Sequence, residues 1–201
     1  SDTTQVNTTV PGDAVRETSD GRRADVLSAY FGLDGMLPAR INYLICKKYK
    51  DTDGMPVIFS DEVDMKTLQA GDIRITTQSG AVKIPECVTL APALDTGELR
   101  TALMLGEFGD HPSDPPVRVE VTGNVLSLDG VLDFKGSQID VTPLPEGPTL
   151  LLGEVVPMDT WELGTKGEQG AGSGCPEGTT QIVRAVWTGG ITRPGGDELE
   201  A

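Results

Sequence analysis

The chain has few aromatic residues and no long apolar run. Phenylalanine, tryptophan and tyrosine together make up 4% of its 201 residues. A hydrophobic core must therefore be built mostly from valine, leucine and isoleucine. No stretch approaches the roughly 18 apolar residues that a membrane-spanning helix needs. The sequence accordingly predicts no membrane span.

Residue patterns that carry catalysis are equally scarce. The one histidine, His111, lies in a proline-rich segment, and nothing places a nucleophile near it, so we expect a surface histidine. The sequence contains no nucleophile elbow, phosphate-binding glycine loop or dinucleotide-binding fingerprint. Among 31 acidic residues no spacing favours the paired carboxylates of a glycosidase. We predict a protein that is not an enzyme and has no cofactor.

Positive charge is in short supply, and the formal net charge is −15. Residues 1–100 hold 11 basic and 15 acidic residues, whereas residues 101–201 hold 5 and 16. Such a chain would not release counterions from a phosphate backbone, so nucleic acid is excluded as a partner. Anionic membrane surfaces are disfavoured for the same reason. We interpret the acidic residues as a solubilising exterior, with divalent cation binding as the alternative.

Glycine and proline, in contrast, are abundant, with 25 and 14 residues. Because glycine and proline at this frequency interrupt long helices, the composition favours short strands joined by turns. Ile73, Ile75 and Thr77 alternate with polar residues, which is typical of a half-buried strand. Similar segments recur at intervals of roughly 8–12 residues, the spacing of an all-β sandwich. The expected strands are residues 41–49, 56–60, 73–77, 82–90, 100–108, 117–121, 125–133 and 139–141.

The composition divides the chain into three parts. Residues 1–37 are expected to be a flexible leader, from which any export signal has been removed, with a candidate two-turn helix at 24–31. Residues 38–143 form the predicted sandwich, and a proline-rich boundary follows it. Residues 149–201 are predicted to be a second, incomplete β-rich unit with a glycine-rich loop at 164–178. Its remaining strands lie outside this chain, or it packs onto the first domain as an appendage.

A family resemblance covers residues 56–130. Residues 57–64 (VIFSDEVD) match a strand that ends in Phe-Ser-x-x-Val-Asp, and residues 67–73 match the link into the next strand. Residues 88–93 and 117–123 stand at the later strands. This pattern resembles the bacterial Ig-like domains of S-layer and other exported envelope proteins. The chain departs from it in its long loops and its two cysteines.

The resemblance implies an Ig-like β-sandwich in a secreted or cell-surface protein. It implies a modular, non-catalytic role in adhesion, assembly or surface structure, with a protein or glycan as partner. Fold analogy alone implies no ligand. The alternative is a secreted carbohydrate-binding module, or an accessory module of a hydrolase whose catalytic part is elsewhere.

Two cysteines lie on expected strands of the sandwich, Cys46 and Cys87. In an exported protein we expect them to form a disulfide across or between sheets, the alternative being two separately buried thiols. Such a bond would close a loop of about 40 residues, worth roughly 3–4 kcal/mol on the chain-entropy model. Cys175 is left as a free thiol, a link to another chain, or the partner of a cysteine in a missing segment. No pair has zinc-finger spacing.

Two further candidates concern ligands. Asp51 and Asp53 resemble the opening of a calcium loop, but the later ligands do not follow, so an ordinary acidic turn is favoured. Trp161, between Thr160 and Glu162, is a candidate for an exposed ring that stacks on sugar. Trp187 follows Val186 and is expected to pack in the core.

Overall fold

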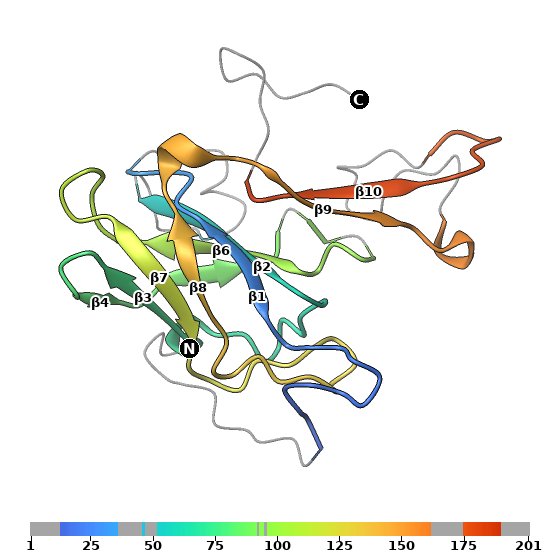
Figure 1. The fold of residues 1–201 in the computed structure, drawn as a ribbon, viewed down its shortest axis with the longest axis horizontal. Coiled ribbons are helices and arrows are strands. Elements are labelled where there is room, and N and C mark those ends of the chain that lie inside the picture. The colour runs from blue at the N-terminus through green and yellow to red at the C-terminus, as the bar shows by residue number, and fades with distance from the viewer. Residues whose placement is uncertain are drawn as a thin grey trace.

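A computed structural model describes residues 13–35, 46, 52–91, 93–94, 96–161 and 175–189. This part of the chain is almost entirely β-structure, which confirms the predicted all-β fold (Figure 1). Its helices are three short 3-10 turns, Ala70–Asp72, Leu144–Glu146 and Met158–Thr160. The strands are β1 (Val26–Tyr30), β2 (Asp53–Phe59), β3 (Ile73–Thr77), β4 (Val82–Lys83), β5 (Cys87–Thr89), β6 (Thr101–Gly106), β7 (Pro116–Val121), β8 (Gln138–Thr142), β9 (Leu150–Val155) and β10 (Val183–Trp187).

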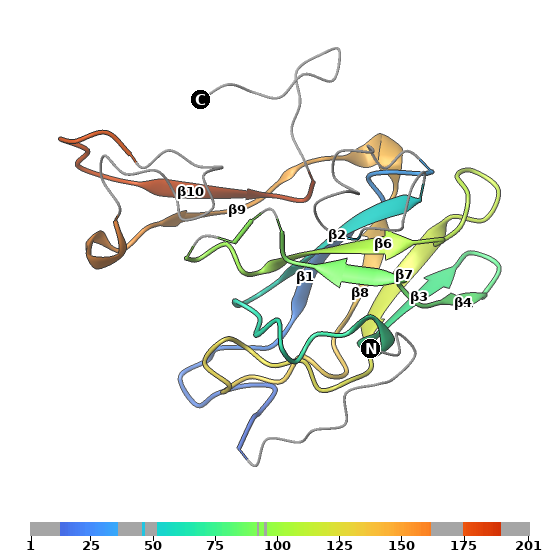
Figure 2. The same ribbon diagram turned by 180° about the vertical axis from the view of Figure 1, so that it is seen from behind.

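Eight strands form one sheet in the order β4-β3-β7-β8-β1-β2-β6-β5. All neighbours are antiparallel except β1 and β8, which are parallel. The sheet curls, so that its two halves face each other (Figures 1 and 2). Inward residues of both halves share one core, in which the rings of Phe59 and Phe134 meet edge to face at 4.9 Å. The other core members include Met55, Val57, Ile73, Ile75, Met104, Val119 and Val121.

The curl brings the two edge strands close together. β4 and β5 lie at opposite ends of the sheet order, yet only residues 84–86 separate them. Four residues of extended chain reach about 14 Å at most, so Cys87 must lie within that distance of Lys83. Pro85 lies in this corner, where it divides the single strand that the sequence predicts over 82–90. Proline cannot donate to a β-ladder, which explains the interruption.

The predicted helix at 24–31 is wrong. Residues 26–30 form β1, which pairs with β2 on one side and with β8 on the other. Ala29, Tyr30 and Phe31 are all buried, because this strand is covered on both faces. A two-turn helix has little stability of its own, so pairing in a sheet easily overrides its local preference. The sheet therefore includes residues that the sequence assigns to the leader.

Other predicted strands differ in detail. Residues 73–77 match β3 at both ends, and 117–121 match β7 within one residue. Residues 125–133 form isolated bridges instead of a strand, with Leu126 opposite Asp133 around the turn at Gly130, whose φ is +74°. Left-handed backbone of this kind suits glycine. The predicted strand at 41–49 lies outside the described residues, apart from Cys46.

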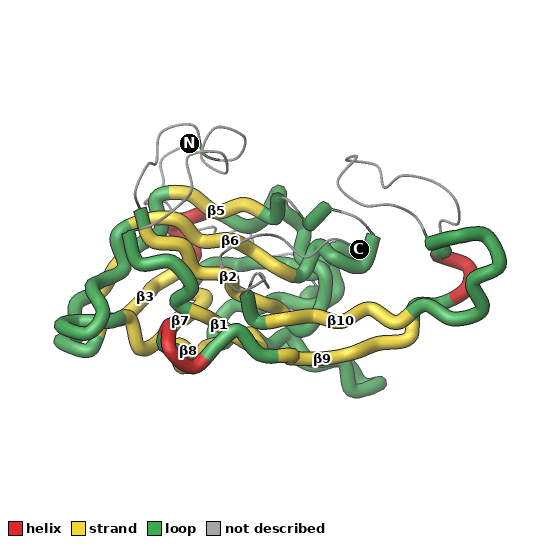
Figure 3. The backbone as a smooth tube through the Cα atoms, turned by 90° about the horizontal axis from the view of Figure 1, so that it is seen from above, coloured by secondary structure: helices red, strands yellow, loops and turns green. Residues whose placement is uncertain are grey.

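β9 and β10 form a separate two-stranded sheet that extends beyond the curled one (Figure 3). The hairpin is anchored at its base by Tyr30, whose hydroxyl donates to the carbonyl of Leu144 at 3.1 Å. Thr149 and Thr188 close the base with two hydrogen bonds, each of 2.9 Å. The strands predicted at 149–156 and 181–187 are therefore present, and they pair with each other.

Candidate functional site

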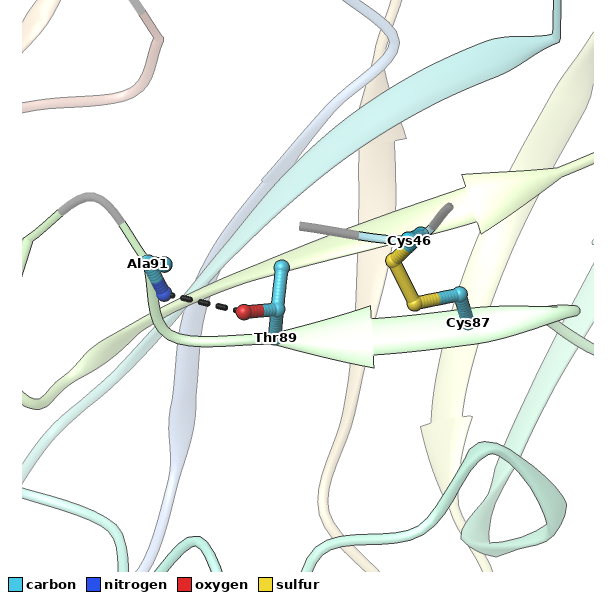
Figure 4. Close-up of a disulfide and its surroundings, with 4 residues drawn as sticks. All are labelled: Cys46, Cys87, Thr89 and Ala91. Carbon is cyan, nitrogen blue, oxygen red and sulfur yellow. Dashed lines mark hydrogen bonds between the residues drawn. A yellow bond between two sulfur atoms is a disulfide. The ribbon is translucent and has the colours of Figure 1, made fainter. Parts of the chain in front are cut away.

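The predicted disulfide is confirmed: Cys46 is bonded to Cys87, with their Cα atoms 6.3 Å apart (Figure 4). Cys87 begins the edge strand β5, opposite Leu105 of β6. Cys46 is buried and packs with Leu105 in a small second apolar cluster on the outer side of the sheet. Beyond the bond, Thr89 accepts a hydrogen bond from the Ala91 amide at 3.0 Å (Figure 4). The bond thus joins Cys46 to β5, which among the described strands pairs with β6 alone.

Of the two residues of the predicted calcium site, the structure describes Asp53, whereas Asp51 lies outside the described residues. Asp53 is the first residue of β2 and is buried. Its carboxylate accepts hydrogen bonds from the backbone amides of Gly35 at 2.8 Å and Phe108 at 2.7 Å. Burial raises the pKa of Asp53, and the negative charges of Asp34 and Asp110 add to the shift. Asp53 thus joins two loops, and the described residues contain no cluster of three or more metal-binding side chains.

The two tryptophans lie in different environments. Trp187 is 39% exposed, so the prediction that it packs in the core is wrong. Trp161 is only partly exposed, and its indole N–H donates to the carbonyl of Val156 at 2.9 Å. Its role in ligand binding stays a prediction. The exposure of Trp187 follows from its position on the outer face of a hairpin that is covered on one side only.

That outer face is apolar and carries no charge. Strand alternation places Val183, Ala185 and Trp187 on it, and all are exposed. They stand opposite Val155, Gly153 and Leu150 of β9, which are exposed as well. An exposed apolar surface bordered by polar residues is typical of an interaction site. Among the described strands, β9 and β10 pair only with each other, so each has a second edge without a strand partner.

The opposite face of the hairpin carries charge. Arg184 and Glu154 are cross-strand neighbours and form an ion pair of 2.8 Å. Arg184 also donates to the carbonyl of Thr96 at 2.9 Å, which connects the hairpin to the segment before β6. Glu154 lies 3.9 Å from Arg100 of that same segment. The hairpin is thus held against the body at its base and along this charged face.

A groove of about 390 Å³ lies between β10 and the segment that leads into β6. Arg100 and Arg184 line it, together with Trp187 at the end of β10. Its other walls are formed by Pro56, Ala93, Gly97, Glu98, Thr101, Ala185, Val186 and Gly189. The groove combines two cations, an indole ring and apolar walls. That combination suits a small ligand with both an anionic and a flat or apolar part.

Sequence reasoning did not find this groove. Arg100 and Arg184 are far apart in the chain, and no local motif connects them. The alternation of apolar residues with Arg184 across 183–187 was the available signal, because it indicates a strand with two different faces. His111, by contrast, is exposed as predicted.

None of the described helices has the length or the apolar character that crossing a lipid bilayer requires. No family model matches the chain, and neither a curated protein nor a solved structure matches it.

Proposed function

We propose that this protein is a non-enzymatic interaction module of an exported envelope or extracellular protein. In this role it binds a protein partner through the outer face of the β9–β10 hairpin. The observation that carries the proposal is the uncharged, exposed apolar face of that hairpin, on a chain whose net charge is −15. The Cys46–Cys87 disulfide supports export, since such bonds persist in oxidising compartments.

The partner is expected to supply an extended segment. A two-stranded sheet with open edges is a template for an added strand, whose backbone would provide affinity and whose side chains would provide specificity. A hairpin alone is marginally stable in water, so an added strand would also stabilise it. On the outer face of the enlarged sheet, the partner strand would place apolar side chains beside Val183 and Val155.

The partner segment is also expected to be basic at its ends. Acidic residues occur in the turns at both ends of the hairpin: Glu146 precedes β9, Asp159 follows it, and Glu177 precedes β10. All three are exposed. Complementary charge would speed association and exclude acidic partners.

A random peptide library selected against the whole protein tests this proposal. We expect enriched peptides to alternate apolar and polar residues and to carry lysine or arginine at their ends. Val183→Lys should weaken their binding about tenfold or more, because a buried unpaired charge opposes strand docking. Val82→Lys is the matched control, since Val82 lies on the edge strand β4 and is 60% exposed against 61% for Val183.

Several outcomes would contradict the proposal. Failure to enrich such peptides would do so, as would equal binding by wild type and Val183→Lys. Sedimentation analysis over a range of protein concentrations is a second test, because it measures self-association. Self-association that Val183→Lys removes would identify a second copy of the chain as the occupant and overturn the basic partner proposed here.

A further inference from the structure

We propose that the groove between β10 and the segment leading into β6 binds a ligand that carries a carboxylate on a six-membered ring. Arg100 would hold the carboxylate and Trp187 would support the ring. This site is distinct from the proposed protein-binding residues Val183 and Val155, because these pair at one end of the hairpin, whereas Trp187 pairs with Leu150 at the other.

Arg100 has too few acceptors for a buried cation. Its side chain is 14% exposed, and its Nε is fully buried without a hydrogen-bond partner. Among the described residues its ion-pair partner is Glu154, and the distance from Nη2 to Glu154 Oε2 is 3.9 Å, which is too long for a hydrogen bond. A guanidinium offers five N–H donors, and buried charges in proteins are normally paired and hydrogen-bonded. Arg100 is therefore able to accept a further anion.

Arg184 shows what a satisfied arginine looks like in the same groove. It donates to Glu154 Oε1 at 2.8 Å and to the Thr96 carbonyl at 2.9 Å. Glu154 thus gives its short contact to Arg184 and only the long one to Arg100. One carboxylate is shared unequally between two guanidiniums.

The other carboxylates near the groove have partners of their own. Glu98 lines the groove and has an interaction partner. Glu62 accepts a hydrogen bond from the backbone amide of Gly97 at 2.5 Å. A ligand carboxylate would consequently bind Arg100, because Arg100 lacks the short hydrogen bonds that Arg184 already makes. Arginine binds carboxylates with strong, geometrically specific hydrogen bonds.

The remaining walls favour a ring over a simple anion. Trp187 offers a partly exposed indole, and Pro56 and Val186 add apolar surface. The groove volume of about 390 Å³ falls within the usual range of small-molecule sites. An aromatic ring and the C–H face of a sugar ring both pack well on indole, so the shared chemistry is a ring with one carboxylate.

Nuclear magnetic resonance of the intact protein tests the site directly. The chain has two tryptophans, and therefore two indole N–H resonances. Titration with D-glucuronate and with benzoate distinguishes a sugar ring from an aromatic one. We expect at least one of them to shift the Trp187 resonance in a saturable manner. The Trp161 resonance should stay in place, because its N–H is hydrogen-bonded to Val156 outside the groove.

D-Glucose and acetate are the matched probes, because each carries only one half of the proposed ligand. Both should bind at least about tenfold more weakly than the better ring acid. Equal binding of acetate would show that the ring is not recognised, and equal binding of glucose would show that the carboxylate is not. Either result, or the lack of any shift at Trp187, would overturn the proposal.

Substitutions test whether Arg100 is the residue that binds the carboxylate. Arg100→Gln should weaken binding of the ring acid about tenfold or more, through loss of a charge-assisted contact. Arg118→Gln is the control, because Arg118 is an exposed arginine on β7 that pairs with Asp140 and does not line the groove. Val183→Lys should leave the titration unchanged, because Val183 lies at the other end of β10 from Trp187. If Arg100→Gln bound as tightly as wild type, the assignment of Arg100 would be wrong.

Discussion

The ring of Tyr30 fills the space that a side chain at position 189 would need. A Cβ atom on Gly189 would lie 2.5 Å from Tyr30 Cδ1, and one on Gly147 would lie 2.8 Å from Tyr30 Cε2. Gly147 precedes β9 and Gly189 follows β10, so the ring is packed between two glycines at the base of the hairpin. This contact fixes the position of the hairpin relative to the curled sheet.

Gly189→Ala is therefore expected to destabilise the protein. Overpacking against the buried ring should lower the free energy of unfolding by about 1–3 kcal/mol, measured by urea denaturation. Hydrogen exchange should show the largest loss of protection in β9 and β10. Gly153→Ala is the control, since a Cβ at that exposed hairpin position would meet its nearest atom at 4.0 Å. Equal stability of Gly189→Ala and Gly153→Ala would contradict this account of the hairpin base.

Gly123 makes a similar close contact with Asp72. A Cβ on Gly123 would overlap the carboxylate of Asp72, which is fully buried and accepts the Gln69 amide at 2.8 Å. The backbone carbonyl of Asp72 also accepts the Thr122 amide at 2.7 Å, so the two segments cannot easily separate. Gly123→Ala should cost about 3 kcal/mol of unfolding free energy. The cost should shrink in an Asp72→Ala background, and an additive double mutant would argue against the contact.

The disulfide is expected to contribute strongly to stability. Replacing both Cys46 and Cys87 with alanine opens a loop of 41 residues, which should lower the free energy of unfolding by about 3–4 kcal/mol. The edge strand β5 should lose hydrogen-exchange protection first. Cys175→Ser serves as the control, because Cys175 is a free cysteine and its replacement should leave the unfolding transition unchanged. A transition unaffected by loss of the Cys46–Cys87 bond would refute this prediction.

The sequence was informative where one strand face is buried and the other is not. In β3 and β7 the alternation of apolar and polar side chains records that difference directly, which is why their bounds were predicted well. β1 is buried on both faces, so its apolar residues do not alternate and the segment resembled a short helix. Only the neighbouring strands β2 and β8 decide its conformation, and they are distant in sequence.

The candidate site was harder to predict for a related reason. The pairing of Cys46 with Cys87 could be predicted from residue type, because two cysteines on expected strands of one domain have few alternative partners. The exposure of Trp187 depends on how the hairpin stands on the sheet, which the Tyr30 contact determines. The approach of Arg100 to Glu154 depends on the same placement. No local pattern contains that information.

Two buried or paired carboxylates should titrate on opposite sides of their ordinary value. Asp129 accepts a hydrogen bond from Arg22 at 2.8 Å and another from Ser127 at 2.6 Å, which lower its pKa to about 2. The pKa of Asp53 is raised, mainly because burial disfavours its charged form. Carbon-detected titration of the carboxyl groups should therefore show Asp53 taking up its proton at a higher pH than Asp129.

These shifts have opposite effects on acid stability. The folded pKa of Asp129 lies below the unfolded value of 3.8, so its contribution is present above about pH 4 and is lost as the pH falls toward 2. Because the Asp129 side chain is 46% exposed, screening limits that contribution to about 1 kcal/mol or less. Asp129→Asn should remove this part of the acid destabilisation in urea unfolding curves recorded at pH 5 and pH 2.

Asp53 has the opposite effect on acid stability. Its pKa is raised in the folded state, so the folded state gains stability as the pH falls through that pKa. Asp53→Asn should accordingly make acid destabilisation steeper than in the wild type, and a shallower response in that variant would contradict the assigned direction.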